Sequence, residues 1–297
     1  MRGVITMSER ITGHTELIGL MAYPIRHSSS PAMQNEAFAK LGYDYAYLAF
    51  EVGADEIEDA VKAIRTLKMR GSNVSMPNKT LVGQYLDELS PAAEMCGAVN
   101  TIVNDHGHLT GHITDGIGFM AALKDNNINA IGKKMTIVGA GGAATAIEIQ
   151  AALDGVGEIV IFNRKDEFWG RAVSTVEKIN TRTSSHAVLY DLAVDQLKKE
   201  MADSYIFVNA TGVGMKPLEG QSVVPDKSYF RPELIVVDVP YSPLETAMRS
   251  MAKEVGCKTM NGLGMMLFQG SAAFELWTGE PMPIEHMKEI LNIRYDD

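Results

Sequence analysis

Short runs of apolar, mostly β-branched or aromatic residues alternate with amphipathic stretches along most of the chain. The first expected strand covers 16–22, and others follow at 45–50 and at the shorter, more polar segment 72–76. Between the last two lies a stretch at 55–67 with apolar residues at helical spacing, which we expect to end at Gly71. This alternation predicts an α/β protein with mainly parallel sheets.

A second series of apolar runs begins near residue 134 and includes a helix expected at 143–153. Its expected strands lie at 135–138, 158–162, 186–189, 205–208 and 234–237. Before this series, the runs 99–103 and 108–113 flank the short polar sequence DHG. An Asp-His-Gly sequence between two apolar runs favours a β-hairpin turn.

The first turn of the second series is rich in glycine. Residues 139–144 read GAGGAA, after an expected strand and before an expected helix, which matches the dinucleotide-binding fingerprint Gly-x-Gly-x-x-(Gly/Ala). Gly139 permits the tight turn, Gly141 lets a pyrophosphate approach the backbone, and the small Ala144 lets the helix pack close to the sheet. The competing interpretation is a tight turn that binds nothing.

The next expected strand leads into Asn163, Arg164, Lys165 and Asp166, where the ribose of a bound dinucleotide would lie. An acidic residue there accepts a hydrogen bond from the ribose of NAD, whereas a basic residue pairs with the 2′-phosphate of NADP. Because this loop has both, we expect use of NAD and NADP, with NAD favoured since Asp166 repels a phosphate. Alternatively, the basic pair belongs to an ordinary solvated loop.

Polar clusters in the first half lie where expected strands end or begin. The serines around Ser28 and Ser30 can cap a helix or donate to a carboxylate. Lys79 follows a strand and a proline turn, and its competing interpretation is a solvated surface lysine. Asp115 stands at a strand-to-helix junction, as an N-cap or as a functional acid, and Asn100 adds an amide at the start of another strand.

The composition fits a folded globular protein, with 46% hydrophobic and 22% charged residues. The net charge of -10 and the pI of about 5.2 argue against nucleic acid as a partner. The chain has no long uncharged apolar run and its first ten residues lack the apolar stretch of a secretory signal, so we expect a cytoplasmic protein without a membrane span. Cys96 and Cys257 lack metal-ligand spacing, and we expect reduced thiols and no metal site.

Several motifs occur in the order in which shikimate dehydrogenases carry them. They are SSSP at 28–31, NVSMPNK at 73–79, GAVNT at 97–101, TDGIGF at 114–119, NATGVGM at 209–215, DVPYSP at 238–243 and GLGMMLFQG at 262–270. On these motifs the chain resembles the shikimate/quinate dehydrogenase family over nearly its whole length. The loop NRKDEF at 163–168 further resembles the quinate/shikimate branch of that family, which accepts NAD as well as NADP.

The resemblance implies a role for each matching residue. Lys79 would be the catalytic acid/base, paired with Asp115. The substrate carboxylate would bind to Ser28 and Ser30, its ring hydroxyls to Ser75, Asn100, Asp115 and Gln269, and Tyr241 would lie near the carboxylate and the nicotinamide. Dinucleotide contacts are implied for Ala140, Gly141, Gly142, Ala143, Asn163, Arg164, Lys165, Asp166, Val239, Pro240, Tyr241, Ser242 and Gly262.

We therefore expect two domains with a ligand cleft between them. Residues 1–115 would form an N-terminal α/β substrate-binding and catalytic domain, and 116–264 a Rossmann-type, doubly wound dinucleotide-binding domain. The segments 263–277 and 284–293 have helical spacing. These C-terminal helices, within about 265–297, either cover the nucleotide domain or pack back on the first domain, and the second arrangement is favoured.

The expected activity is hydride transfer between NAD(P) and the ring C3 hydroxyl or ketone of shikimate, quinate or both, in aromatic amino-acid biosynthesis or quinate metabolism. One alternative is a non-catalytic NAD(P)-binding regulatory protein of the same fold, against which the presence of Lys79 and Asp115 counts. Another is a different two-domain dehydrogenase, against which the paired serines and Gln269 count. The expected partner is a small-molecule substrate; oligomeric state is not readable, and a homodimer is compatible with the sequence.

Overall fold

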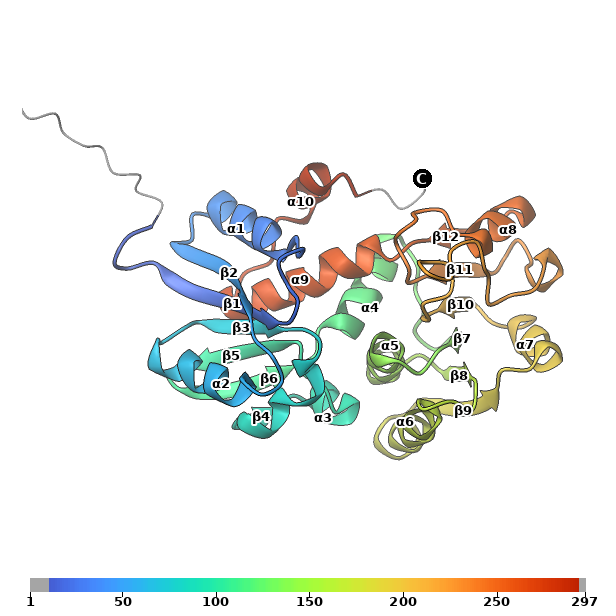
Figure 1. Ribbon diagram of the computed structural model, residues 1–297. Helices are drawn as coiled ribbons and strands as arrows, with labels where there is room; N and C mark the ends of the chain where they lie inside the picture. Colours follow the sequence, from blue (N-terminus) through green and yellow to red (C-terminus); the bar gives the residue numbers. More distant parts are fainter. Residues whose placement is uncertain (1–10, 294–297) are drawn as a thin grey trace, which may run out of the picture. The chain divides into compact units, whose positions relative to one another are not determined.

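A computed structural model describes residues 11–293 of the chain (Figure 1); the N-terminal segment inspected for a signal lies outside the described residues. The described part contains no helix that is long and apolar enough to cross a membrane. Its contacts divide into two compact units. The first unit holds the residues up to Ser90, Gly97–His112 and Ala273–Leu291, and the second holds Pro91–Cys96 and Ile113–Ala272.

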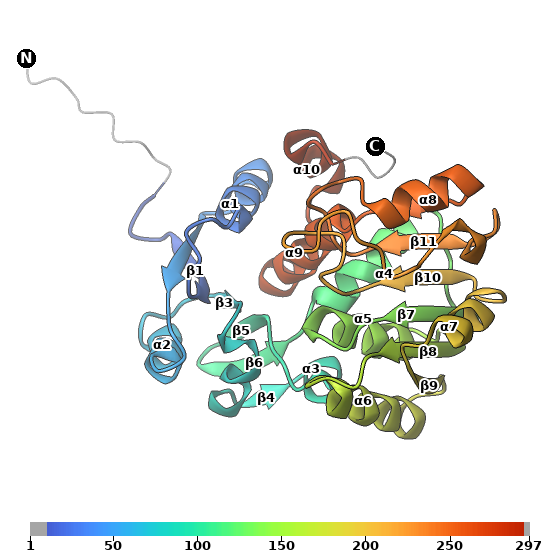
Figure 2. The same ribbon diagram turned by 45° about the vertical axis from the view of Figure 1, so that its right-hand side comes forward.

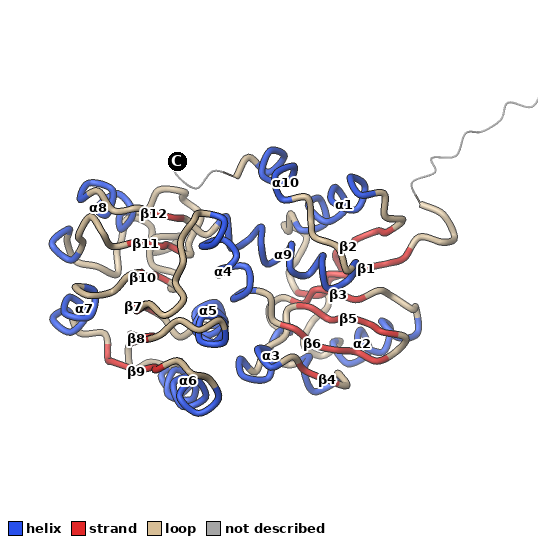
Figure 3. The backbone as a smooth tube through the Cα atoms, turned by 180° about the vertical axis from the view of Figure 1, so that it is seen from behind, coloured by secondary structure: helices blue, strands red, loops and turns tan. Residues whose placement is uncertain are grey.

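The first unit is built on a six-stranded sheet with the order β2-β1-β3-β5-β6-β4. Its strands, drawn red in Figure 3, are β1 (Glu16–Ala22), β2 (Tyr45–Glu51), β3 (Gly71–Val74), β4 (Glu88–Leu89), β5 (Thr101–Asp105) and β6 (His108–His112). β1 is parallel to β2 and β3, but β5 runs antiparallel to both β3 and β6. The sheet is therefore mixed, which the expectation of mainly parallel sheets missed for this unit. Its helices are α1 (Ser30–Leu41), α2 (Ile57–Thr66), α10 (Ile284–Leu291) and two short 3₁₀ helices (Asn78–Thr80 and Val82–Tyr85).

The predicted hairpin is confirmed at β5 and β6. His106 and Gly107 connect the two strands, with φ angles of 51° and 101°. Two successive residues with positive φ are the signature of the tight turns whose twist matches that of antiparallel strands. The hairpin places Asn100 next to β5 at the sheet edge where β1 and β3 end.

The end of helix α9 (Leu263–Thr278) belongs to the first unit. Trp277 is fully buried, and its indole Nε1 donates to the carbonyl of Ile102 at 3.0 Å. Arg70 Nε in turn donates to the Trp277 carbonyl at 2.7 Å. Farther along, His286 Nε2 lies 3.1 Å from the Glu36 carboxylate. These contacts attach the segment Ala273–Leu291 to strands and helices between residues 30 and 105.

The second unit contains a fully parallel sheet with the order β12-β11-β10-β7-β8-β9. Its strands are β7 (Lys134–Val138), β8 (Glu158–Asn163), β9 (His186–Asp191), β10 (Ile206–Asn209), β11 (Ile235–Asp238) and β12 (Thr259–Met260). The helices are α3 (Pro91–Cys96), α4 (Asp115–Asp125), α5 (Gly142–Leu153), α6 (Trp169–Arg182), α7 (Val194–Met201), α8 (Ala247–Val255) and the start of α9. This strand order, with the first strand central and the chain winding outward on both sides, defines the doubly wound nucleotide-binding topology.

Helices cover both faces of this sheet, with α4, α5 and α6 on one face and α7 and α8 on the other (Figure 2). Successive residues of β8 follow this division. Ile159 and Ile161 belong to the core shared with α5 and α6, whereas Val160 and Phe162 belong to the core shared with α7 and α8. Burial on both faces explains why these strands read as continuous apolar runs without polar alternation.

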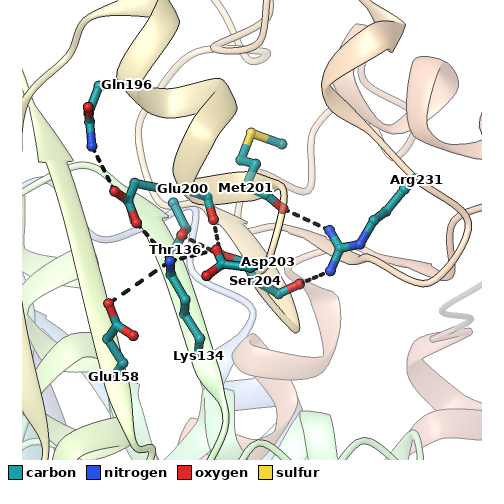
Figure 4. A network of polar contacts seen from close by, with 9 residues as sticks. All are labelled: Lys134, Thr136, Glu158, Gln196, Glu200, Met201, Asp203, Ser204 and Arg231. Atoms are coloured by element: carbon teal, nitrogen blue, oxygen red, sulfur yellow. Dashed lines mark hydrogen bonds and ion pairs between the residues drawn. The ribbon is translucent and has the colours of Figure 1, made fainter.

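A polar network closes the edge at which the strands of this sheet begin (Figure 4). Lys134, the first residue of β7, lies 2.7 Å from a carboxylate oxygen of Glu200 and 2.6 Å from one of Asp203. Although burial opposes the charged form, the hydrogen bonds to Asp203 and Glu200 raise the pKa of the Lys134 ammonium. The Lys134 ammonium and the carboxylates of Glu200 and Asp203 neutralise one another at this edge. A ligand is therefore expected at the opposite edge, where the strands end.

Candidate functional site

The glycine-rich turn connects β7 to α5 at the edge where the parallel strands end. Gly139 has a φ of 126°, and a Cβ atom on it would lie 2.9 Å from the carbonyl oxygen of Ala210. Gly139 is therefore required by the fold itself. In contrast, a Cβ atom on Gly141 or Gly142 would meet no protein atom within 4 Å. Open space beside two glycines at a helix N-terminus fits a ligand phosphate that approaches the backbone.

A cavity of about 400 Å³ opens at this turn, inside the second unit. Gly139, Ala140 and Gly141 line one part of it, and Asn163, Arg164 and Asp166 line another. The sequence predicted five of these residues, all except Gly139, as dinucleotide contacts, and the structure brings them together around one cavity. The remaining lining residues are Val138, Phe168, Leu192, Ala210, Thr211, Gly212, Val213, Gln221, Ser222 and Val223.

Asp166 is held in place within the loop that follows β8. One of its carboxylate oxygens accepts hydrogen bonds from Asn163 Nδ2 at 2.9 Å and from the Phe168 N–H at 3.0 Å. The Arg164 guanidinium lies 4.0 Å from the other oxygen, and its side chain is 80% exposed. Lys165 does not line the cavity; its ammonium lies 3.7 Å from Asp191 and over the ring of Trp169. The hydrogen-bonded Asp166 carboxylate and the exposed Arg164 guanidinium therefore lie side by side in the loop that is expected to face the adenosine ribose.

The segment that follows β11 lies outside this cavity. It contains Val239, Pro240, Tyr241 and Ser242, of which Tyr241 is 48% exposed. A Cβ atom on Gly262 would lie 1.8 Å from the Val239 carbonyl oxygen. Gly262 is therefore explained by close backbone packing after β12, and the structure does not bring these residues or Ala143 to the cavity wall.

The predicted substrate residues of the first unit follow or precede neighbouring strands. Ser28 and Ser30 come after β1, Ser75 and Lys79 come after β3, and Asn100 precedes β5. Backbone hydrogen bonds join these segments, since the Val74 N–H donates to the Asn100 carbonyl and the Val99 N–H donates to the Lys79 carbonyl, both at 2.8 Å. The Ser75 N–H donates to the Met21 carbonyl at 3.0 Å. The five residues therefore belong to one edge of one sheet.

The serine cluster lies at the start of α1. The N-cap of α1 is Ser29, whose side chain makes no capping hydrogen bond. Ser28 Oγ instead accepts from the N–H of Ser30, the first residue of the helix, at 3.2 Å, and both serines are partly exposed. One serine hydroxyl thus satisfies a helix N-terminal N–H, as the capping interpretation expects, and the role of the serines towards a substrate carboxylate stays a prediction.

Buried amides fix the strands around Ser75 and Lys79. Asn73 accepts a 2.7 Å hydrogen bond from the Tyr47 hydroxyl and donates to the Asn100 carbonyl and to Thr101 Oγ1, both at 2.9 Å. Asn78 Nδ2 donates to the Val52 carbonyl at 2.8 Å. These two amides serve the fold, and the adjacent Ser75 and Lys79 are partly buried.

Two further predicted residues lie on adjoining helices of the second unit. Asp115 is the first residue of α4, and Thr114 is the N-cap, so the interpretation of Asp115 as the cap is wrong. A Cβ atom on Gly118 would lie 2.4 Å from the Gln269 backbone nitrogen, which means that the backbones of α4 and α9 touch here. Gln269 Nε2 donates to the Met266 carbonyl at 3.1 Å.

Sequence reasoning missed part of the cavity wall. Thr211, Gly212 and Val213 belong to a motif that was recognised, but no ligand contact was expected from them. Gln221, Ser222 and Val223 come from a loop between β10 and β11 without any motif. Only their position after the carboxyl end of β10 could have pointed to them.

The doubly wound sheet, the glycine turn and the cavity beside it define the second unit as a dinucleotide-binding domain. Comparison with known proteins places the chain more narrowly. A family model described as the shikimate dehydrogenase substrate binding domain matches residues 20–102, and one described as the shikimate 5′-dehydrogenase C-terminal domain matches 262–291. The chain belongs to the shikimate dehydrogenase family.

Individual relatives agree with this assignment. The chain is 64% identical to a shikimate dehydrogenase (NADP(+)) from Listeria innocua, over 96% of this chain and 98% of that protein. A crystal structure of shikimate 5-dehydrogenase from Listeria monocytogenes, in complex with shikimate and NAD, is 64% identical, with a TM-score of 0.94 over 96% of this chain and 99% of that one.

A quinate dehydrogenase from Corynebacterium glutamicum, in complex with NAD, is 30% identical, with a TM-score of 0.83 over 94% of this chain and 99% of that one. By contrast, the two relatives at 64% identity are both named as shikimate dehydrogenases. This finding does not support the finer assignment to the quinate/shikimate branch that the NRKDEF loop suggested.

Proposed function

We propose that this chain catalyses hydride transfer between NAD(P) and the C3 hydroxyl of shikimate, a reaction of aromatic amino-acid biosynthesis. The observation that carries the proposal is the open space beside Gly141 and Gly142 in a doubly wound domain, in a chain that belongs to the shikimate dehydrogenase family. A bound dinucleotide supplies the acceptor for the hydride. The protein has to bind the alcohol, orient it and take up its proton.

We assign the proton transfer to Lys79, with Asp115 as its partner. Alcohol oxidation releases one hydride and one proton, and the hydroxyl proton passes to the Lys79 amine as the C–H bond breaks. As an ammonium, Lys79 also stabilises negative charge that develops on the alcohol oxygen. Asp115 accepts hydrogen bonds from the Lys79 nitrogen and from a ring hydroxyl next to the one that is oxidised, and so orients the amine towards the reacting hydroxyl.

The remaining predicted residues recognise the substrate. Ser28 and Ser30 donate hydroxyl hydrogen bonds to its carboxylate, and Tyr241 lies near that carboxylate and the nicotinamide. Ser75, Asn100 and Gln269 bind the ring hydroxyls. Several neutral donors and acceptors suit a substrate with several hydroxyls, because an analogue that lacks one leaves a buried polar group unpaired.

For the dinucleotide we propose contacts from Ala140 to Ala143 to the phosphates and from Asn163 to Asp166 to the adenosine ribose. Val239 to Ser242 and Gly262 line the nicotinamide end. Both NAD and NADP serve, and NAD is favoured because the Asp166 carboxylate lines the cavity and repels a 2′-phosphate, whereas the Arg164 side chain, which lines it as well, is 80% exposed and its charge is screened by solvent. The Listeria innocua relative carries NADP(+) in its name, so the proposed preference for NAD is tested directly.

The variant Asp166→Ala should shift the preference towards NADP. Two like charges 4 Å apart repel by about 1 kcal/mol in water and by about 4 kcal/mol near a protein surface, so we expect the ratio of kcat/KM for NADP to that for NAD to rise by about tenfold or more. Asp203→Ala is the matched control, because Asp203 pairs with Lys134 at the opposite edge of the sheet and does not line the cavity. An unchanged ratio in Asp166→Ala would rule out this role.

Initial rates with shikimate and with quinate, each with NAD and NADP, test the proposed reaction. We expect reduction of both dinucleotides with shikimate and a kcat/KM for quinate that is lower by at least about tenfold, since quinate has a saturated ring and one more hydroxyl for the site to accommodate. No reduction of either dinucleotide by shikimate would refute the proposed function. A higher kcat/KM for quinate than for shikimate would make quinate the substrate of the proposed reaction.

A further inference from the structure

Two polar side chains end neighbouring strands of the dinucleotide-binding sheet. Asn209 is the last residue of β10 and Asp238 the last of β11, and the two are directly paired in register. Both side chains are buried, with exposures of 1% and 0%. They lie at the carboxyl edge of the sheet, the edge at which doubly wound domains bind their ligands.

Asn209 fixes the turn that follows its own strand. Its Nδ2 donates to Asp238 Oδ1 at 2.8 Å and to the Val213 carbonyl at 3.0 Å. Its Oδ1 accepts from the N–H and the hydroxyl of Thr211, at 3.1 and 2.7 Å. Thr211 and Val213 line the dinucleotide cavity, so the Asn209 amide determines the shape of this part of the wall.

Asp238 holds the next loop in the same way. Its Oδ2 accepts a hydrogen bond from the hydroxyl of Thr246, the N-cap of α8. Asp238 and Thr246 stand at the two ends of residues 239–245, the loop that contains the proposed nicotinamide-end contacts. One buried carboxylate therefore anchors this loop through one oxygen and the Asn209 turn through the other.

We propose that Asp238 is a positioning residue for the dinucleotide, whose carboxylate holds two ligand-facing loops in register with each other. The inference rests on the proposed function, because it takes the cavity to be a dinucleotide site. Asp238 does not line the cavity and acts through Asn209 and Thr246. A backbone hydrogen bond from the Val239 N–H to the Asn209 carbonyl, at 2.9 Å, joins the same two segments beside the Asp238 carboxylate.

The ionisation of Asp238 makes this role sensitive to pH. Burial raises the pKa of Asp238 to about 6, although the hydrogen bonds from Thr246 and Asn209 and the nearby Arg249 guanidinium favour the charged form. Glu245 is the other charged group that acts on it, and it opposes ionisation. Above this pKa the carboxylate accepts from both partners. Below this pKa the Asp238 carboxyl is protonated, and the oxygen that carries the proton no longer accepts a hydrogen bond from its partner.

The test is direct binding of NAD and of shikimate, each measured by calorimetric titration with the intact protein. Loss of a hydrogen bond to a charged group corresponds to about a tenfold to hundredfold change in an equilibrium constant, so we expect Asp238→Asn to raise the Kd of NAD by that factor. The Kd of shikimate should change by less than that of NAD, since Tyr241 is the only proposed shikimate contact in the two loops. The wild-type Kd of NAD should rise as the pH falls through about 6, and that of Asp238→Asn should not.

Threonine variants separate positioning from folding. Thr246→Ser keeps the hydroxyl and should bind NAD like the wild type, whereas Thr246→Val removes the donor and should bind several-fold more weakly. Equal Kd values for Thr246→Val and Thr246→Ser, or wild-type affinity in a folded Asp238→Asn, would overturn the inference. Failure of the wild type itself to bind NAD or NADP would instead overturn the proposed function.

Discussion

Replacement of Lys79 by alanine should lower the rate of hydride transfer by about a hundredfold to ten-thousandfold, the usual contribution of a positioned proton-transfer group. Dinucleotide affinity should be retained, because Lys79 belongs to the first unit whereas the whole cavity at the glycine turn belongs to the second. Single-turnover measurement of nicotinamide reduction, with substrate saturating, isolates the chemical step from product release. Wild-type single-turnover rates in this variant would eliminate Lys79 from the mechanism.

Two other lysine variants sharpen the result. Lys62→Ala is the matched control, since its ammonium is 60% exposed on α2 and pairs only with Glu58 and Asp59 among the contacts recorded for the described residues. Its rate should equal that of the wild type. Lys79→Arg keeps the positive charge but hardly accepts or releases a proton, because the guanidinium pKa is above about 12. Partial recovery of the rate in Lys79→Arg would assign most of the effect to charge stabilisation, and no recovery would assign it to proton transfer.

Replacement of Glu148 by glutamine should remove a large pH dependence of stability. Glu148 lies in α5 with no exposed surface, and neither of its carboxyl oxygens has a hydrogen-bond partner. Burial raises the pKa of this carboxyl from 4.5 to about 8. The folded protein therefore keeps the proton to a higher pH than the unfolded chain does. The contribution of Glu148 to stability is greatest below pH 4.5 and falls until the pH reaches about 8, by about 1.4 kcal/mol per pH unit.

The measurement is the free energy of unfolding by denaturant, for the variant and the wild type, across this pH range. Glu148→Gln should match the wild type within about 1 kcal/mol at the acid end, since a buried amide and a protonated carboxyl are similar in size and polarity. It should be more stable by several kcal/mol at pH values above the folded pKa. Glu177→Gln, an exposed position on α6, is the control and should follow the wild-type curve. Parallel curves for Glu148→Gln and the wild type would contradict the burial argument.

Sequence reasoning predicted the elements whose causes are local. The first strand was predicted with its observed bounds, Glu16–Ala22, and the helix after the glycine turn differs from its expected bounds by one residue. Strands buried on both faces and helices with one apolar face carry periodic patterns that do not depend on distant residues. The ribose loop was found for a similar reason, since a strand end at a fixed distance from the glycine turn locates it.

Features set by distant contacts were missed. Gly71 was expected to end a helix, but that helix ends at Thr66, and Gly71 begins β3. A Cβ atom on Gly71 would lie 2.2 Å from the Ile102 carbonyl oxygen and 2.5 Å from Trp277 Nε1, and no local pattern reports a partner so far away in the sequence. The short strands β4 and β12, each of two residues, are too brief to show periodicity. The anchoring of two loops by Asp238 likewise depends on side chains that meet only in the folded sheet.

The most direct test of the account is a crystal structure of the complex with shikimate and NAD. We predict that the Lys79 ammonium and the Asp115 carboxylate both lie within about 3 Å of the hydroxyl that is oxidised, the distance required for proton transfer, and that the nicotinamide ring faces the carbon bearing it. A complex in which Lys79 points into bulk solvent, away from that hydroxyl, would contradict the proposed mechanism.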